Sequence, residues 1–337
     1  MSELSSSDPS PWILRPSRAE IRHTRVLFYS RHASDLTPAR AQRFGYSVVY
    51  HASIVAALRE LGLTVAVGSD PELLFTEIDA DYLWFTLIRA PFDGHELLIP
   101  SIAAYRGLAF LGPAAPVRAL SEDKALGKAL AASLGLEVAP HRMIDPLSPA
   151  AADLALSGRW VLKPRTGVMS EALAVLGCAA DWAPALKEAA LPVHGGREFI
   201  AEELVPGLNL AVPVVEGLPP LSVFEERGVG ADNILTEAGK EGRTADYGSR
   251  PYAGPGAAEA AAAAAALAAA IAPFDYARFD FRYDPQGGRL VFLEVNMNCA
   301  LGPAGVVARA AALQGIDHRT LVGHIFTHSL RRQRSPL

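Results

Sequence analysis

An acidic residue in one predicted strand and a Glu-x-Asn pair in the next form the most informative pattern in the sequence. Asp280 lies in the run ARFDFRYD (277–284), and Glu294 and Asn296 lie in LVFLEVNMN (290–298). Because side chains alternate across a strand, residues two apart share one face of a sheet. Carboxylate and amide oxygens are hard ligands of the kind that Mg²⁺ prefers, usually together with substrate phosphates and water. The pattern therefore predicts a magnesium site, with Mn²⁺ as the alternative metal.

Arg278 stands two residues before Asp280 and is therefore predicted on the same face. A guanidinium at this place can neutralise a phosphoryl group or a developing oxyanion. The alternative interpretation is an ordinary strand edge with solvated charges. Apolar neighbours in both runs disfavour it, because they require a buried opposite face: Phe279, Phe281, Leu293 and Val295.

Two lysines and a glycine-containing loop form a second group. Lys163 ends the apolar run WVLK, and the segment PRTGVMS after it contains Gly167 and Ser170. Backbone N–H groups of such a loop can hold phosphate oxygens while the lysine adds a positive charge. The loop lacks the GxxxxGK[ST] pattern of a Walker A site. Lys124 lies in SEDKALGKALAASLG (121–135), which predicts one helix with Ser121 as its N-cap. Taken alone, each lysine is also typical of a solvated surface.

The run FIAEELVPGLNL (199–210) is the third candidate. A strand that ends in acids and continues as Leu204-Val205 before a Pro-Gly turn can present main-chain groups to a planar base. Glu202 could accept a hydrogen bond from an exocyclic amine of that base. An ordinary strand and turn explains the same residues equally well, so both interpretations stay open on this run alone.

The elements that must position these residues follow from apolar periodicity. Between residues 24 and 113, strand-like and helix-like runs predict a small α/β unit with a parallel sheet. From residue 159 onward, strand-like runs dominate and end in a hairpin, signalled by the turn sequence Gln286-Gly287-Gly288. Helices are predicted at 257–272, at 303–314 and after 319. The glycine-rich segment 227–256 is predicted to be a mobile loop that covers the site.

Composition narrows the class of protein further. The chain has 337 residues, of which 50% are hydrophobic and 20% charged, so it can bury the cores of two or three compact units. A net charge of −5 argues against a nucleic-acid partner. The two cysteines give neither a disulfide framework nor a metal-binding pair, and with no signal peptide or membrane span predicted, the expected compartment is the cytoplasm. The absence of a Rossmann fingerprint after the first strand disfavours a nicotinamide or flavin dehydrogenase.

In their order, these pieces resemble the ATP-grasp superfamily, and within it the D-alanine–D-alanine ligase branch. The resemblance covers roughly residues 95–330 and rests on Asp-Lys in a helix, Lys-Pro before a Gly/Ser loop, Glu-Glu-Leu-Val-x-Gly, Arg-x-Asp and Glu-x-Asn. It implies an α/β and α+β fold in which a parallel-sheet N-terminal domain precedes an ATP-grasp fold of two α+β subdomains. The expected divisions are a disordered or draped segment 1–22, an N-terminal domain 23–116, a central subdomain 117–205 and a C-terminal subdomain 206–330.

The resemblance also implies a role for each candidate residue. ATP would lie between the two subdomains, and Asp280, Glu294 and Asn296 would hold one or two Mg²⁺ ions. Arg278 would face the transferred phosphoryl group, and Arg250 would cap the γ-phosphate. The residues implied at the nucleotide, from phosphates through adenine to ribose, are Lys124, Lys163, Gly167, Ser170, Glu202, Glu203, Leu204, Val205 and Asn209.

The implied reaction joins a small carboxylate to an amine through an acyl phosphate and releases ADP and phosphate. The implied partners are these small molecules and, in a homodimer, a second copy of the chain. Three differences from the family pattern affect the ribose and substrate sides: Asn209 replaces a glutamate, the run 297–303 differs, and the Gly-rich opening with its substrate-recognising Glu is missing. They predict a specialised amino-acid or small-carboxylate ligase rather than one that joins two D-alanines. Two alternatives stay open: a cyclising ATP-grasp enzyme, and a nucleotide-binding module without catalysis.

Overall fold

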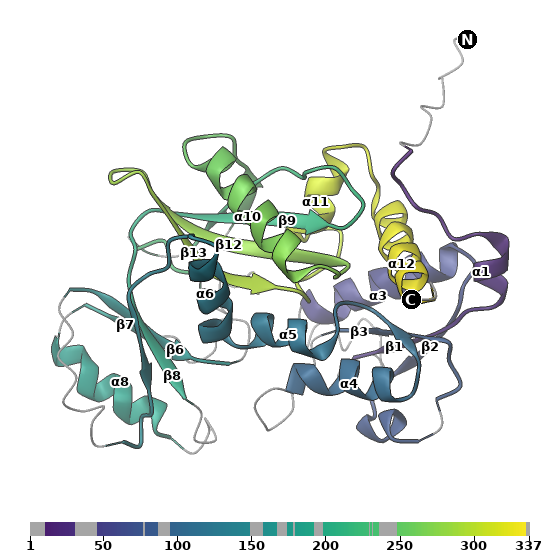
Figure 1. Cartoon of the computed structure of the whole chain (residues 1–337), viewed down its shortest axis with the longest axis horizontal. Helices are drawn as coiled ribbons and strands as arrows, with labels where there is room; N and C mark the ends of the chain where they lie inside the picture. The colour runs from purple at the N-terminus through teal and green to yellow at the C-terminus, as the bar shows by residue number, and fades with distance from the viewer. Residues whose placement is uncertain are drawn as a thin grey trace, which may run out of the picture.

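The computed structural model contains three β-sheets, one parallel and two antiparallel (Figure 1). It describes residues 11–30, 46–76, 78–86, 95–148, 158–166, 174–177, 179–191, 198–228, 230, 232–235 and 248–334. Gly167, Ser170 and residues 229, 231 and 236–247 of the predicted covering loop lie outside the described residues. The α/β and α+β fold predicted from the sequence is confirmed.

The N-terminal sheet has the strand order β2-β1-β3-β4, and every pair is parallel. Its strands are β1 (Arg25–Tyr29), β2 (Thr64–Gly68), β3 (Tyr82–Phe85) and β4 (Ala109–Phe110). Runs such as VLFY and YLWF are buried throughout, as expected for parallel strands that helices cover on both faces. Its helices are α3 (Tyr46–Glu60), η1 (Pro71–Leu74), η2 (His95–Leu97) and α4 (Leu98–Tyr105).

The central sheet is antiparallel with the order β5-β8-β6-β7, and α8 (Trp182–Ala189) packs on it after the short η3 (Ala179–Asp181). Its strands are β5 (His141–Ile144), β6 (Trp160–Pro164), β7 (Ala174–Leu176) and β8 (Phe199–Glu203). The edge strand β5 was not predicted, because its sequence HRMI is short and half polar.

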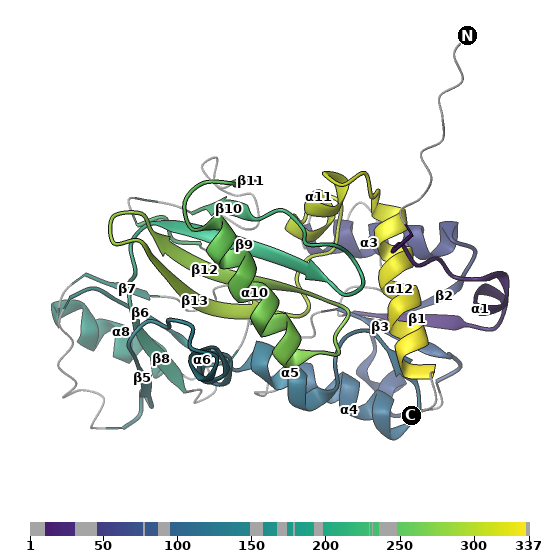
Figure 2. The ribbon, with the colours of Figure 1, turned by 45° about the horizontal axis from the view of Figure 1, so that its top comes forward.

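The C-terminal sheet has the order β11-β10-β9-β12-β13, again antiparallel. The helix α10 (Ala257–Ile271) crosses one of its faces (Figure 2) and buries Phe279 and Phe281 there. The opposite face carries Asp280. Its strands are β9 (Leu208–Val215), β10 (Phe224–Arg227), β11 (Gly248–Pro251), β12 (Tyr276–Asp284) and β13 (Arg289–Asn296). The predicted hairpin is present, whereas β11 lies within the predicted loop 227–256 and β10 was not predicted.

The predicted single helix over 121–135 is wrong. Two helices replace it, α5 (Ala115–Glu122) and α6 (Lys124–Ser133), separated at Asp123. Asp123 has an extended backbone, and its carboxylate accepts hydrogen bonds from the N–H groups of Ala125 and Leu126, so Asp123 is the N-cap. The hydroxyl of Ser121 instead accepts a hydrogen bond from the N–H of Met297.

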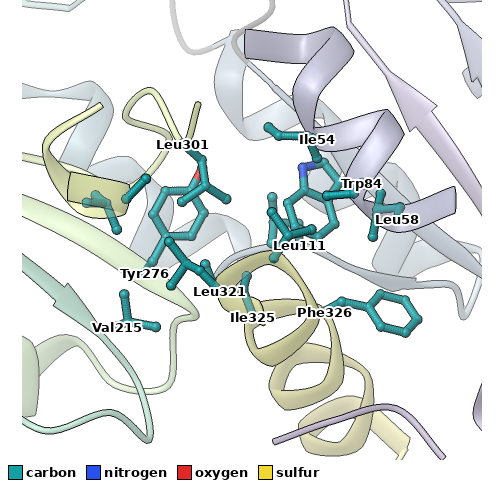
Figure 3. Packing of buried hydrophobic residues seen from close by; sticks show 14 of the residues in the cluster. Ile54, Leu58, Trp84, Leu111, Val215, Tyr276, Leu301, Leu321, Ile325 and Phe326 are labelled. Atoms are coloured by element: carbon teal, nitrogen blue, oxygen red, sulfur yellow. The ribbon is translucent and has the colours of Figure 1, made fainter. Parts of the chain in front are cut away.

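The last helix ties the two ends of the chain together. After α11 (Val306–Ala312), α12 (His318–Arg334) packs Leu321, Ile325 and Phe326 into one core with Trp84 of the N-terminal sheet (Figure 3). Of the segment 1–22, expected to be disordered or draped over the surface, residues 11–22 are described and include α1 (Arg18–Arg22). The N–H of Leu14 donates to Nδ1 of His324 in α12. Across the described part of the chain, no helix combines the length and hydropathy that crossing a membrane requires.

Candidate nucleotide and metal site

The four residues predicted around the metal lie together on one face of the β12–β13 hairpin. Asp280 is directly opposite Glu294 in the ladder, and Arg278 is opposite Asn296. Nε and Nη2 of Arg278 donate to the two carboxylate oxygens of Asp280, each at 2.7 Å. The amide of Asn296 donates to Asp280 at 2.7 Å and to Glu294 at 3.3 Å. The alternation of the two strands thus brings this group together as the spacing predicted.

Burial sets the charge state of this group. Asp280 is 8% exposed, and burial raises its pKa from 3.8 to about 6 although Arg278 opposes the rise. Burial also disfavours the charge on Arg278, but Asp280 and Glu226 outweigh it and raise the pKa of Arg278 well above its ordinary value. Arg278 therefore stays positively charged while Asp280 titrates near neutral pH.

The chemistry of this donor set fits Mg²⁺. Asp280 and Glu294 offer two carboxylates and Asn296 an amide oxygen, which are hard donors for a cation that keeps water and substrate oxygens as further ligands. The described residues hold no group of three or more His, Cys, Asp or Glu side chains suited to a metal. With two carboxylates and one amide oxygen, the set could hold a cation whose remaining ligands are water and substrate oxygens.

Two lysines, one from β6 and one from α6, contact Glu202 of β8. Nζ of Lys163 lies 2.5 Å from Oε1 of Glu202, and Nζ of Lys128 lies 2.8 Å from Oε2. All three residues are at most 9% exposed. Burial alone would raise the pKa of Glu202, but the charges and hydrogen bonds of both lysines lower it to about 2. For Lys163, the attraction of Glu202 outweighs burial and raises the pKa, so this lysine remains charged.

The charge on Lys124 is influenced both by the lysine cluster and by the metal group. Burial lowers its pKa, the charge of Glu294 counteracts this effect, and Lys163 adds repulsion. Its backbone N–H donates to the carbonyl of Arg165 at 3.1 Å, so the start of α6 is fixed to the end of β6. The guanidinium of Arg165 reinforces this joint by pairing with Asp123 at 2.7 Å. The structure thus places both predicted phosphate-contacting lysines at one junction of elements.

The segment after β8 forms the connection between the central and C-terminal sheets. The N–H of Glu203 donates to the carbonyl of Pro140 at 2.9 Å, and the N–H of Leu204 donates to the carbonyl of Arg159 at 2.8 Å. Val205 is 3% exposed. The main chain predicted to meet adenine is therefore held by β5 and β6 on its central-sheet side.

Asn209, implied at the ribose, makes three internal hydrogen bonds. Its amide nitrogen donates to the carbonyls of Glu226 at 3.1 Å and Asn233 at 2.8 Å. Its amide oxygen accepts from Nη1 of Arg282 at 2.8 Å. The side chain is thus already engaged in this state, and a contact with ribose remains a prediction.

Arg250, implied at the γ-phosphate, is not brought together with the metal group. Arg250 of β11 lies directly opposite Glu225 of β10 in the ladder. Their side chains also form an ion pair, with Nη2 of Arg250 2.6 Å from the carboxylate of Glu225. Glu225 is in turn opposite Leu210 of β9, whose side chain packs in the core under α10. Residues in direct register share a face, so Arg250 lies on the face away from Asp280.

Two residues of the site were missed from the sequence although their spacing signalled them. Lys128 follows Lys124 by four positions, which places both on one helical face. Arg282 follows Asp280 by two positions and therefore shares its face of β12. The residues they contact come from other elements, and no local pattern identifies those.

Comparison with known proteins decides the family, although no family model matches the chain. A D-alanine–D-alanine ligase of Acidiphilium cryptum (strain JF-5) is 30% identical over 284 residues, which span 80% of this chain and 88% of that protein. The chain belongs to the D-alanine–D-alanine ligase family. The D-alanine–D-alanine ligase of Caulobacter sp. (strain K31) is 27% identical over 294 residues, spanning 85% of this chain and 90% of the relative.

Solved structures show that the chain has the fold of D-alanine–D-alanine ligases. The D-alanine–D-alanine ligase of Bacillus anthracis complexed with ATP superposes with a TM-score of 0.72 at 16% identity, over 92% of this chain and 99% of that one. The VanG D-Ala:D-Ser ligase of Enterococcus faecalis gives 0.69 at 14% identity, over 90% and 99%. As a member of the D-alanine–D-alanine ligase family, the protein is an ATP-grasp enzyme that joins a carboxylate to an amine with a carbon–nitrogen bond, and its substrates are small molecules.

Proposed function

We propose that the protein activates an amino acid or a related small carboxylate as an acyl phosphate and transfers the acyl group to an amine. A carboxylate oxygen attacks the γ-phosphorus of ATP, and the bond to the β-phosphate oxygen breaks to release ADP. The amine nitrogen then attacks the acyl carbon, expels phosphate and loses a proton. The observation that carries the proposal is the gathering of Arg278, Asp280, Glu294 and Asn296 on one sheet face, within electrostatic reach of Lys124.

Phosphoryl transfer requires mainly positioning and the neutralisation of charge. Lys124 and Lys163 are proposed to neutralise the α- and β-phosphates, and Glu202 holds Lys163 charged and in place until the nucleotide arrives. Arg278 is proposed to stabilise the charge on the γ-phosphoryl group and then the oxyanion of the tetrahedral intermediate. When bound to Asp280, Glu294 and Asn296, Mg²⁺ supplies additional positive charge next to the phosphates.

The nucleotide is proposed to lie between the central and C-terminal sheets. Glu202 and the main chain of Glu203, Leu204 and Val205 would read adenine, Asn209 would reach the ribose, and the loop with Gly167 and Ser170 would cover the phosphates. These contacts rest on the resemblance and on the position of the segment after β8. Arg250 is included as a γ-phosphate contact only if its strand rearranges, because it now pairs with Glu225 on the other face.

We infer that the substrates differ from a pair of D-alanines, the substrates named for the curated relatives. The run after Asn296 differs from the family pattern and is held by side chains of α5 and η2. Arg118 donates to the carbonyl of Met297 at 3.1 Å, and Asn298 donates to the buried carboxylate of Glu96 at 3.4 Å. Glu96 also lies 3.8 Å from Nη2 of Arg118, so one buried pair holds this run in place.

The test is a product assay with Mg-ATP and pooled L- and D-amino acids, read by mass spectrometry. The expected result is ADP with the mass of two substrates less one water. ADP with one substrate less water would indicate cyclisation instead, and AMP would refute the acyl phosphate.

The metal group is tested with Glu294→Ala, which is expected to lower turnover at least a hundredfold. Glu198→Ala is the matched control, because Glu198 is an exposed carboxylate of the central region. Size-exclusion chromatography with light scattering tests the proposed homodimer.

A further inference from the structure

Arg282 is a buried cation on the nucleotide face that the proposed chemistry does not use. It is 4% exposed, lies opposite Asn209 in the ladder, and follows Asp280 by two residues. Its guanidinium donates four hydrogen bonds, all to carbonyl-type oxygens. The acceptors are the carbonyl of Val205 at 2.9 Å, Oδ1 of Asn209 at 2.8 Å, and the carbonyls of Asn233 and Asp232, each at 2.9 Å.

Burying the charged guanidinium of Arg282 is unfavourable in free energy. Burial lowers the pKa of Arg282 to about 10, and the charges of Asp232 and Glu202 offset this only in part. Across the described ranges, no carboxylate lies within salt-bridge distance of Arg282. Burying a charge without a counter-ion is unfavourable unless hydrogen bonds satisfy it. The four acceptors do so, and three of them are main-chain carbonyls whose positions the guanidinium therefore fixes.

The first of these carbonyls belongs to the connection between the two subdomains. Val205 is followed by Pro206 and Gly207, and β9 begins immediately afterwards. Gly207 has φ +108°, and a Cβ there would lie 2.1 Å from the carbonyl oxygen of Tyr283. Arg282 therefore holds a connection that is already confined by close backbone contact. Among the residues that the structure describes, none accepts the N–H of Val205.

The other two carbonyls belong to a turn that closes over the same connection. Asn233 adopts φ +53°, and its amide donates to the carbonyl of Gly207 at 3.1 Å. Its side-chain oxygen accepts from the N–H of Gly228 at 2.6 Å. Asp232 pairs with Arg159, whose carbonyl accepts the N–H of Leu204. The turn therefore joins β6, the end of β10 and the connection into one unit, with Arg282 at its centre.

We propose that Arg282 is a positioning residue for nucleotide recognition, which orients the main chain at Val205 toward the base and clamps the 232–233 turn over it. This inference rests on the proposed nucleotide site. The four hydrogen bonds hold the connection and the turn in one conformation, and in this way Arg282 prepares the connection for binding. Preorganisation of this kind raises affinity by removing ordering costs, and it raises discrimination between bases that differ in their hydrogen-bonding edges.

The experiment measures ADP binding by calorimetry in Arg282→Met and Arg282→Lys. Arg282→Met removes every donor at similar length and is expected to weaken ADP binding at least tenfold. Arg282→Lys keeps the charge but not the fork of donors, and is expected to recover only part of the loss. Arg289→Met is the matched control, because Arg289 lies on the neighbouring strand, is 41% exposed and pairs with Glu137. Circular dichroism and thermal melting verify that each variant is folded.

Steady-state kinetics separate positioning from a general structural defect. In Arg282→Met, KM for ATP is expected to rise about tenfold while kcat at saturating ATP and KM for the other substrates change less than twofold. The preference for ATP over GTP in kcat/KM is expected to fall. ADP binding within twofold of wild type in both Arg282 variants would overturn the inference. If Arg282→Met fails to fold, ADP binding is measured in Arg282→Lys and in Asp232→Ala instead. Asp232→Ala frees the turn from Arg159. The proposed function fails separately, if wild type forms no ADP.

Discussion

Replacing Glu202 by glutamine removes the negative charge that lies between Lys128 and Lys163. The pKa of Glu202 falls from 4.5 in its ordinary environment to about 2 in the folded protein. That difference corresponds to about 3 kcal/mol of stabilisation at neutral pH. The removal also leaves two buried ammonium groups without their partner, which costs a similar amount in other buried pairs. Glu202→Gln is therefore expected to lower the melting temperature of the nucleotide-free protein by about 6–10 °C.

The pH dependence of this loss follows from the direction of the shift. Because folding lowers the pKa of Glu202, its contribution is complete above about pH 5 and is lost as the pH falls from 4.5 toward 2, where the unfolded chain takes up the proton first. The gap in melting temperature between wild type and Glu202→Gln should be constant from pH 8 to pH 5 and shrink below pH 4.5.

The assay is differential scanning calorimetry over this pH range, with Glu198→Gln as the matched control. Glu198 is 55% exposed and pairs with Arg165, so its loss is expected to cost less than about 1 kcal/mol. The reasoning is refuted if the two variants melt within about 2 °C of each other at pH 7.5. It is equally refuted if the gap for Glu202→Gln does not narrow in acid.

Three further predictions concern the metal group, the subdomain connection and the core. Since burial raises the pKa of Asp280 to about 6, affinity for Mg²⁺ measured by calorimetry should fall several-fold between pH 7.5 and pH 5.5, and a flat profile would contradict this. Gly207→Ala should lower the free energy of unfolding, measured by chemical denaturation, by well over 2 kcal/mol because the new Cβ meets the carbonyl of Tyr283. Gly288→Ala is the control: Gly288 has φ +64° but open space around it, so the loss should be only about 1 kcal/mol. Equal losses in the two variants would contradict the clash. Leu267→Ala, on the buried face of α10 at 1% exposed, should cost about 2–5 kcal/mol without changing turnover per folded molecule, and a neutral effect would show a poorly packed core.

Features set by local periodicity could be predicted from the sequence. The alternation around Asp280 and Glu294 predicted the two strands of the hairpin and the face on which four polar side chains gather. This was possible because a period-two pattern determines which face of the sheet each residue takes. The alanine-rich run 257–272 became α10, since alanine is a strong helix former. The parallel N-terminal sheet followed from alternating strand-like and helix-like runs.

Features set by contacts distant in sequence could not be predicted. Asp123 separates α5 from α6 because its carboxylate caps α6 and pairs with Arg165, a residue 42 positions away. Glu202 was expected at adenine, and its two lysine partners come from β6 and α6. Arg250 was placed by resemblance alone, and only the register of β10 with β11 shows which face it takes.

The position of α12 has a consequence for the order in which the chain can fold during synthesis. The ring of Phe326 lies 5.1 Å from that of Tyr82, and the hydroxyl of Ser329 donates to the carbonyl of Phe110 at 2.9 Å. The N-terminal sheet therefore lacks one wall of its core until α12 has emerged from the ribosome. Until α12 has been synthesised, a growing chain exposes the apolar surface around Trp84, so the packing of this core waits for a helix encoded more than 230 residues later.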